Sequence, residues 1–389
     1  MYVQRSIAAE FDKRTGAYGM VAVVGPRQAG KTTFLKHAAA GRDASYVLLD
    51  DPDARELFET DVKKFEKQYF ETRELAILDE VQNCRNAGRN LKYLADSGRK
   101  AWLTSSSEVL LGKKVLSYLV GRVSILRLYP FSLGEFLQAT RAGELTEMSA
   151  RRGVWEHATY GGYPKVVTTN DIELKKTMLF DLYQTMLLKD VAWTFSVEDT
   201  SSLERLAKYV AVNAGGIFSY EHASRDLSLS FQTVKKYLDA MEKSYLVGRA
   251  PPFYTNKKKE ITKQAKFYFI DGGLRNAILH AFPTEPDGNA FENYIYTELA
   301  KAGYAPQYWR TKGGAEVDFV IQHEGKPVPV EAKLRADSVE RSMHSFISAY
   351  GPSKALVVTY HGKGRTEIID GCRVSFTTPA KLTETLGKP

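Results

Sequence analysis

The sequence is poor in cysteine, with two in 389 residues. Cys84 and Cys372 lie far apart, and neither belongs to a Cys-x-x-Cys motif or a Cys/His cluster. This spacing excludes a disulfide framework and argues against a structural zinc site. We expect both cysteines to be ordinary buried thiols.

Long apolar runs are also missing. No stretch approaches the ~18 consecutive apolar residues of a membrane-spanning helix, and the first residues lack the basic and apolar regions of an export signal. Hydrophobic residues make up 43% of the chain and charged residues 26%, which is typical of globular proteins. We therefore expect a cytoplasmic protein with no membrane partner.

The charge balance is basic. The chain has 54 lysines and arginines against 46 acidic residues, a formal net charge of +8. Such a balance favours polyanionic partners, either nucleic acid or nucleotide phosphate. The length of the chain predicts two or three domains of roughly 150 residues each.

The first ~135 residues alternate short apolar runs with amphipathic helical stretches, the pattern of a parallel sheet covered by helices. Runs that are apolar throughout suit strands buried on both faces. The expected strands are residues 20–24, 45–49, 75–78, 101–104 and 123–128. The fold class of this part is therefore α/β.

A phosphate-binding motif follows the first expected strand. The segment that begins at Gly25 fits G-x-x-x-x-G-K-[ST] and precedes an expected helix over residues 32–40. Lys31 is expected to reach the β- and γ-phosphates and Thr32 to ligate Mg²⁺. The predicted nucleotide-binding residues are Gly25, Pro26, Arg27, Gln28, Ala29, Gly30, Lys31, Thr32 and Thr33.

Two adjacent carboxylates end the third expected strand. Asp79 is predicted to hold the Mg²⁺ with Thr32, and Glu80 to orient or deprotonate the attacking water. ATP and Mg²⁺ are the expected cofactors, with ADP as the product, and Lys31 and Glu80 the expected catalytic residues.

A helix-turn-helix pattern lies near the middle of the chain, with helices expected from Tyr220 and over residues 231–243. Strands over residues 245–254 and 266–270 would flank the basic turn of Lys257, Lys258 and Lys259 and form a wing. Gln232, Thr233, Lys235 and Lys236 are placed for contacts with DNA, whereas Phe231, Tyr237, Leu238 and Met241 recur at the spacing of core residues. A winged helix that only packs or binds protein stays an alternative.

These motifs resemble the archaeal and bacterial AAA-type ATPases that carry a nuclease-like C-terminal domain. The resemblance rests on the phosphate-binding motif, Leu49-Asp-Asp-Pro-Asp, Leu78-Asp-Glu-Val-Gln, Leu103-Thr-Ser-Ser-Ser, Gly121-Arg, Tyr160-Gly-Gly-Tyr-Pro and Phe269-Ile-Asp-Gly-Gly-Leu-Arg. It implies a sensor of the γ-phosphate at Thr104 or Ser106, although such proteins usually have Thr-Gly-Ser there. It also implies that Arg122 donates positive charge to the transition state, in the same subunit or in a neighbour.

The last third of the chain resembles the core of restriction endonucleases. Helices and strands are expected at residues 291–301, 308–310, 316–323 and 326–333, and Asp318 precedes Glu331 and Lys333 in a Glu-x-Lys motif. The resemblance implies that Glu292, Asp318 and Glu331 gather a divalent metal and that Lys333 steadies the attacking water. Because a fold can outlive its chemistry, an inactive DNA-binding or scaffolding remnant stays the favoured alternative.

These observations predict an AAA-type ATPase domain (residues 1–140), a helical linker (141–200), a winged helix (201–272) and a restriction-endonuclease-like domain (273–389). The leading hypothesis is an ATPase that acts on or with DNA. Two alternatives stay open: a nucleotide-dependent switch that recruits a protein partner, and a metal-dependent DNA endonuclease gated by ATP. The sequence does not fix the oligomeric state.

Overall fold

The computed structural model describes residues 2–108, 111–112, 115–140, 146–254, 260, 263–285 and 287–387. The chain forms two compact units. The first unit consists of Met1–Pro130, Lys189–Ser196 and Lys243–Tyr245, and the second of Phe131–Leu188, Val197–Glu242 and Leu246–Pro389. Two short stretches from the middle of the chain thus return to the first unit.

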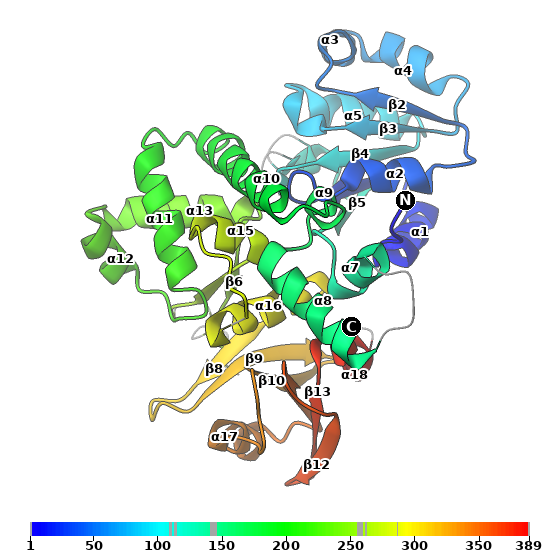
Figure 1. The fold of residues 1–389 in the computed structure, drawn as a ribbon. Helices are drawn as coiled ribbons and strands as arrows, with labels where there is room; N and C mark the ends of the chain where they lie inside the picture. Colours follow the sequence, from blue (N-terminus) through cyan, green and yellow to red (C-terminus); the bar gives the residue numbers. More distant parts are fainter. Residues whose placement is uncertain are drawn as a thin grey trace. The chain divides into compact units, whose positions relative to one another are not determined.

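The first unit is built on a parallel sheet of five strands in the order β2-β3-β4-β1-β5 (Figure 1). The strands are β1 (Met20–Val24), β2 (Ala44–Leu48), β3 (Leu75–Asp79), β4 (Ala101–Ser105) and β5 (Val123–Arg127). Each lies within one residue of the strand that the apolar runs predict, which confirms the α/β class of this part.

Helices cover both faces of this sheet (Figure 1). Along β1, Met20, Ala22 and Val24 face one apolar core, while Val21 and Val23 face the other. The first core is completed by α3 (Pro52–Thr60), α4 (Val62–Phe70) and α5 (Ala87–Asp96), and the second by α1 (Ala8–Ala17) and α2 (Lys31–Ala38). Burial on both faces explains why these strands are apolar throughout.

The second unit begins with helices. They are α7 (Leu133–Thr140), α8 (Glu147–Tyr160), α9 (Pro164–Val167), α10 (Ile172–Thr185), the first residues of the π-helix η3 (Met186–Trp193), α11 (Thr200–Val212), α12 (Tyr220–Leu227), α13 (Phe231–Lys243) and α15 (Gly272–Ile278). Ser228 adopts a left-handed conformation directly after α12. This turn separates α12 from α13 where the helix-turn-helix pattern predicts it.

The strands β6 (Val247–Ala250) and β7 (Lys266–Phe269) follow α13 and pair in antiparallel fashion. The predicted wing lysines, Lys257 to Lys259, lie outside the described residues. Tyr237, Leu238 and Met241 are buried as predicted, but the prediction for Phe231 is wrong, since its side chain is 41% exposed. Phe231 is the first residue of α13 and its ring lies against Tyr220 instead of entering the core.

A mixed sheet of six strands completes the second unit, in the order β12-β13-β11-β10-β9-β8 (Figure 1). The strands are β8 (Gln307–Arg310), β9 (Glu316–His323), β10 (Lys326–Lys333), β11 (Lys354–Thr359), β12 (Arg365–Ile369) and β13 (Cys372–Thr377). The accompanying helices are α16 (Gly288–Lys301), α17 (Arg341–Tyr350) and α18 (Leu382–Leu386). β9 and β10 form an antiparallel hairpin, and β10 pairs in parallel with β11.

Two expectations from composition can be compared with this fold. Among the described residues, none of the helices combines the length and the apolar character needed to cross a bilayer. Cys84 and Cys372 are both buried and form no disulfide, which confirms their assignment as ordinary thiols.

Candidate functional site

The loop between β1 and α2 has the conformation of a phosphate-binding loop. Gly30 is the N-cap of α2, with φ of 96°, and no side chain caps the first turn of the helix. The backbone N–H groups of that turn are therefore donors suited to an anion. Gly25 has φ of +152°, and a Cβ there would lie 2.1 Å from the carbonyl oxygen of Leu128. Only glycine fits at this position.

Lys31 is the buried cation of this loop, with 5% of its surface exposed. Its Nζ donates to the carbonyl oxygens of Gly25 at 3.0 Å and Pro26 at 2.9 Å. Burial lowers the pKa of Lys31, although nearby carboxylates, Glu80 foremost, act in the opposite direction. None of the ion pairs among the described residues includes Lys31. A buried ammonium that faces neutral carbonyls would gain from an anionic ligand.

Asp79 is held by three hydroxyl groups at the end of β3. The Oγ1 of Thr32 lies 3.0 and 2.9 Å from its two carboxylate oxygens, and the Tyr46 hydroxyl donates to Oδ2 at 2.7 Å. The hydroxyl of Thr104 on β4 donates to Oδ1. The predicted residues Thr32, Asp79 and Thr104 thus come together, with a carboxylate and a hydroxyl side by side as hard oxygen ligands of the kind Mg²⁺ prefers.

Glu80 is turned away from Asp79 by its backbone. It has φ of 58°, which is uncommon for a residue other than glycine, and its N–H donates to the Thr104 hydroxyl at 2.9 Å. Its Oε2 accepts hydrogen bonds from the Ser106 hydroxyl at 3.2 Å and from the amide of Gln82. Adjacent carboxylates therefore have separate partners, and both hydrogen bonds to the Glu80 carboxylate go to Oε2.

Arg122 does not join this site. It forms an exposed ion pair with Asp96 at 2.7 Å. Arg122 precedes β5, and Val123 pairs with Met20, whereas the phosphate-binding loop follows Val24. Arg122 and the phosphate-binding loop therefore lie at opposite ends of the parallel strands, which are five residues or about 16 Å long. Any role of Arg122 at the γ-phosphate would have to be played on a neighbouring subunit.

Three further residues belong to the site although the sequence analysis assigned them no role there. Tyr46 donates a hydrogen bond to Asp79, and Gln82 donates one to Glu80. The third residue is Asp190, whose Oδ1 accepts a hydrogen bond from Nε of Arg27 at 2.6 Å. Gln82 follows the carboxylate pair directly, so the sequence contained a local signal for it. Asp190 lies 163 residues from Arg27, and no local pattern indicates that contact.

Carboxylates also gather in the second unit, beside a cavity of about 680 Å³ lined in part by Glu316, Asp318, Lys333 and Glu340. Lys333 Nζ lies 3.2 Å from Glu331, 3.7 Å from Asp318 and 3.5 Å from Glu340. Burial raises the pKa of Glu331 well above its usual range, and the nearby Asp318 raises it further. Glu331, Lys333 and Asp318 therefore come together as predicted.

Glu292 is held by other partners. It pairs with Lys266 Nζ at 3.1 Å and accepts a hydrogen bond from the Tyr268 hydroxyl at 2.6 Å. Lys266 is 2% exposed, and its Nζ also lies 2.6 Å from Glu316. In the described part of the chain, no three acidic, histidine or cysteine side chains are grouped to hold a metal ion. Glu292, Asp318 and Glu331 are thus not grouped as one set in this structure; Glu292 is paired with Lys266, whereas Asp318 and Glu331 lie beside Lys333.

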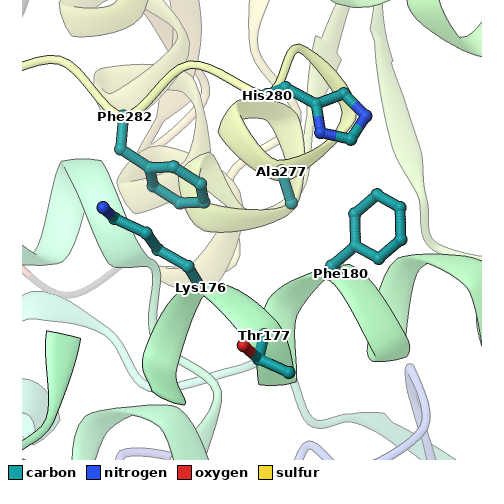
Figure 2. A pocket seen from close by; sticks show the side chains of 6 residues that line it. All are labelled: Lys176, Thr177, Phe180, Ala277, His280 and Phe282. Atoms are coloured by element: carbon teal, nitrogen blue, oxygen red, sulfur yellow. The ribbon is translucent and has the colours of Figure 1, made fainter. Parts of the chain in front are cut away.

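A second cavity in this unit, of about 490 Å³, contains none of the predicted site residues. Figure 2 shows Lys176, Thr177 and Phe180 on α10, Ala277 on α15, and His280 and Phe282 in the segment after α15. The rings of Phe180 and His280 are 5.1 Å apart, and Lys176 Nζ lies 5.8 Å from the ring of Phe282.

Comparison with protein families supports the class that the loop and the carboxylates define. Residues 17–137 match the family described as AAA domain. This match supports an AAA-type P-loop ATPase domain in this part of the chain, for which nucleotide binding is expected. Residues 151–285 and 287–379 match two domains of unknown function, DUF8612 and DUF4143.

Similar proteins occur in both bacteria and archaea. An uncharacterized protein of Haemophilus influenzae is 26% identical over 318 residues, which cover 80% of this chain and 76% of that protein. An uncharacterized protein of Mycobacterium tuberculosis is 26% identical over 384 residues, 94% of this chain and 82% of that one. One from Methanocaldococcus jannaschii is 23% identical over 377 residues, covering 89% and 83%.

Solved structures with similarity to the chain include a Walker-type ATPase of Pyrococcus abyssi, with 12% identity and a TM-score of 0.48, covering 72% of this chain and 96% of that one. Another is a signal transduction ATPase with a tetratricopeptide repeat sensor from Pyrococcus horikoshii. It is 13% identical with a TM-score of 0.32, covering 78% of this chain and 45% of that one.

Proposed function

We propose that the first unit binds MgATP at Gly25 to Thr33 and hydrolyses it with Glu80 as the base. The observation that carries this proposal is the separation of two adjacent carboxylates. Asp79 lies beside Thr32, whereas Glu80 is turned toward Ser106 and Gln82. One carboxylate is thereby available for the metal and the other for water.

Each residue then has a distinct role. Lys31 and the first-turn N–H groups of α2 bind and orient the phosphates. Thr32 and Asp79 would hold Mg²⁺, which supplies charge neutralisation at the phosphate oxygens. Glu80 orients the water and takes its proton, and the hydroxyls of Thr104 and Ser106 fix the two carboxylates. Ser106 thereby acts on Glu80 as a positioning residue.

The test is Glu80→Gln, which keeps the size of the side chain and removes the base. ATP hydrolysis should fall by roughly 10²–10⁴-fold, the usual contribution of a general base, while the dissociation constant for ATP changes little. Glu71→Gln, an exposed glutamate in the same unit, is the control. Equal turnover in the Glu80 variant and the wild type would remove Glu80 from this role.

We also propose that nucleic acid is a partner of the second unit. The order α11, α12, α13, β6, β7 with an antiparallel strand pair supports a winged helix. On α13, Gln232, Lys235 and Lys236 are exposed, and Phe231 is the one large apolar side chain exposed among its described residues, so this face is mainly polar and basic. A basic face favours DNA over the alternative of an apolar protein partner.

Gel-shift titration across a salt series tests this proposal. The double variant Lys235→Glu, Lys236→Glu should weaken DNA binding and reduce its salt dependence, by about one counterion for each lysine that contacts phosphate. Lys63→Glu, Lys64→Glu on α4 makes the same change in charge and should bind as the wild type does. Equal losses in both variants would show only a nonspecific effect of net charge.

For the last part of the chain, we propose a restriction-endonuclease-like fold that acts in DNA binding or as a scaffold. The succession α16, β8, β9, β10, α17, β11 with Asp318, Glu331 and Lys333 in adjacent strands supports the fold. The ion pair of Lys266 with Glu292, which occupies one of the predicted metal ligands, supports a role without metal-dependent cleavage. Incubation of plasmid DNA with the protein, ATP and Mg²⁺ or Mn²⁺ should leave it intact. Cleavage that is lost in Lys333→Ala would instead support the ATP-gated endonuclease.

A further inference from the structure

Asp190 brings a buried negative charge to the phosphate-binding loop. Its side chain is 6% exposed and pairs with Arg27, which is 32% exposed, at 2.6 Å. Arg27 is one of the four residues between the glycines of the loop. The pair therefore joins the loop to η3, a helix that follows it by more than 150 residues in the sequence.

The charge of Asp190 acts on both cations of the loop. Burial raises the pKa of Asp190, and the charges of Arg27 and Lys31 oppose this effect. In turn, the charges of Glu80 and Asp190 counter the effect of burial on the pKa of Lys31. The charges of Arg27 and Lys31 thus attract Asp190, and they would attract nucleotide phosphates in the same way. A phosphate and the Asp190 carboxylate would therefore compete for these two cations.

The position of Asp190 in the chain gives this competition a consequence. Asp190 belongs to Lys189–Ser196, which packs in the first unit, whereas the residues directly before and after this stretch belong to the second unit. The backbone oxygen of Asp190 accepts a hydrogen bond from the hydroxyl of Ser244 at 2.7 Å. Ser244 lies in Lys243–Tyr245, the other returning stretch. Both stretches are therefore tied together at Asp190.

We propose that Asp190 is a nucleotide-sensing residue, whose carboxylate holds Arg27 until nucleotide phosphate competes for this arginine and loosens the stretch 189–196. This inference rests on the proposed binding of nucleotide and adds the route by which binding changes the chain. A guanidinium forms strong, geometrically specific pairs with phosphate as well as with carboxylate. Nucleotide can therefore replace the contact that holds the stretch, which is the differential interaction that a ligand-driven change requires.

The first arm of the test measures affinity in the full-length protein, with ADP and with a non-hydrolysable ATP analogue, both in Mg²⁺. Asp190→Asn keeps the shape and a hydrogen-bond acceptor but removes the competing charge. It should bind nucleotide about ten-fold tighter, within the usual range of coupling between two sites. Asp190→Glu, which keeps the charge, should resemble the wild type.

Asp96→Asn is the matched control, because it also removes a carboxylate paired with an arginine of the first unit, at the opposite edge of the sheet. It should leave nucleotide affinity unchanged. Unchanged or weaker binding by Asp190→Asn would overturn the proposal, since weaker binding would mean that Asp190 preorganises Arg27 for phosphate.

The second arm measures hydrogen exchange of residues 189–196. In the wild type, exchange should become faster when nucleotide binds; in Asp190→Asn it should already be fast and respond little. If hydrogen exchange in the wild type does not change when nucleotide binds, the proposal that nucleotide releases residues 189–196 is overturned. A wild type that fails to bind nucleotide would overturn the proposed function and this inference together, whereas binding without an effect of Asp190→Asn overturns this inference alone.

Discussion

Two buried lysines illustrate how the two units use a positive charge in different ways. Lys31 and Lys266 are 5% and 2% exposed, and burial acts to lower the pKa of both. Yet the pKa of Lys31 is lowered, and the pKa of Lys266 is raised. The difference lies in their partners, which are two backbone carbonyls for Lys31 and the carboxylates of Glu292 and Glu316 for Lys266.

The comparison indicates what each site still needs. The charge of Lys31 has no directly bonded counter-ion among the described residues, so its loop is suited to an anionic ligand. The charge of Lys266 is balanced within the fold, so the carboxylates around it have little need of a metal ion. A sequence motif cannot distinguish these two cases. It gives the residues that could bind a ligand, but it does not show which other residues of the chain already bind them.

The largest expected effect concerns Lys266. Lys266→Met would leave the partly buried Glu292 without its cation and Glu316 with Arg310 alone, and removal of one partner from a buried ion pair typically costs about 3–5 kcal/mol. Denaturant unfolding of the full chain should show this loss. Lys176→Met, which removes a lysine of the exposed pair with Glu173, should cost less than about 1 kcal/mol.

Metal ions sharpen the same prediction. Millimolar Mn²⁺ should raise the melting temperature of Lys266→Met, because the freed carboxylates can then bind it, and should leave the wild type unchanged. A variant as stable as the wild type, with no response to metal, would contradict the assignment of Lys266 as the internal counter-ion.

The opposite behaviour is expected of Lys31. Lys31→Met should reduce nucleotide affinity by about 2 kcal/mol or more, roughly 30-fold, because charged hydrogen bonds to phosphate are lost. Its stability without nucleotide should stay close to that of the wild type, since an apolar side chain of similar length replaces a buried charge that lacks a carboxylate partner. Calorimetric titration and thermal unfolding measure the two quantities. A large loss of stability would place Lys31 in the same class as Lys266.

The sequence was sufficient for features set by neighbouring residues. Continuous apolar runs predicted all five strands of the first sheet, and fixed spacing predicted the loop around Lys31 and the two carboxylates at the end of β3. The contacts of Tyr46, Asp190 and Lys266 depend instead on which distant segments become neighbours. Tyr46 reaches Asp79 because β2 is hydrogen-bonded to β3, and no local pattern fixes that order.

A smaller effect is expected from Thr104, whose hydroxyl joins Asp79 to the backbone of Glu80. Thr104→Val keeps the shape and removes these hydrogen bonds, about 1 kcal/mol in net terms for each. We expect ATP turnover to fall about ten-fold with little change in nucleotide affinity, and Thr104→Ser to restore most of it. Ser105→Ala is the control, since the Ser105 hydroxyl bonds to the Ser107 backbone. An affinity loss as large as the loss of turnover would contradict a role in positioning the carboxylates.

The smallest effect is expected from Arg122, which lies at the edge of the sheet remote from Lys31. Its ion pair with Asp96 is exposed on both sides, so Arg122→Ala should cost less than about 1 kcal/mol of stability. Turnover per molecule at high dilution should match the wild type, because Arg122 cannot reach the phosphates of its own chain in this fold. If neighbouring subunits use Arg122, turnover of the wild type will rise with protein concentration and that of the variant will not. A loss in the variant that is independent of concentration would contradict the placement of Arg122 away from its own nucleotide.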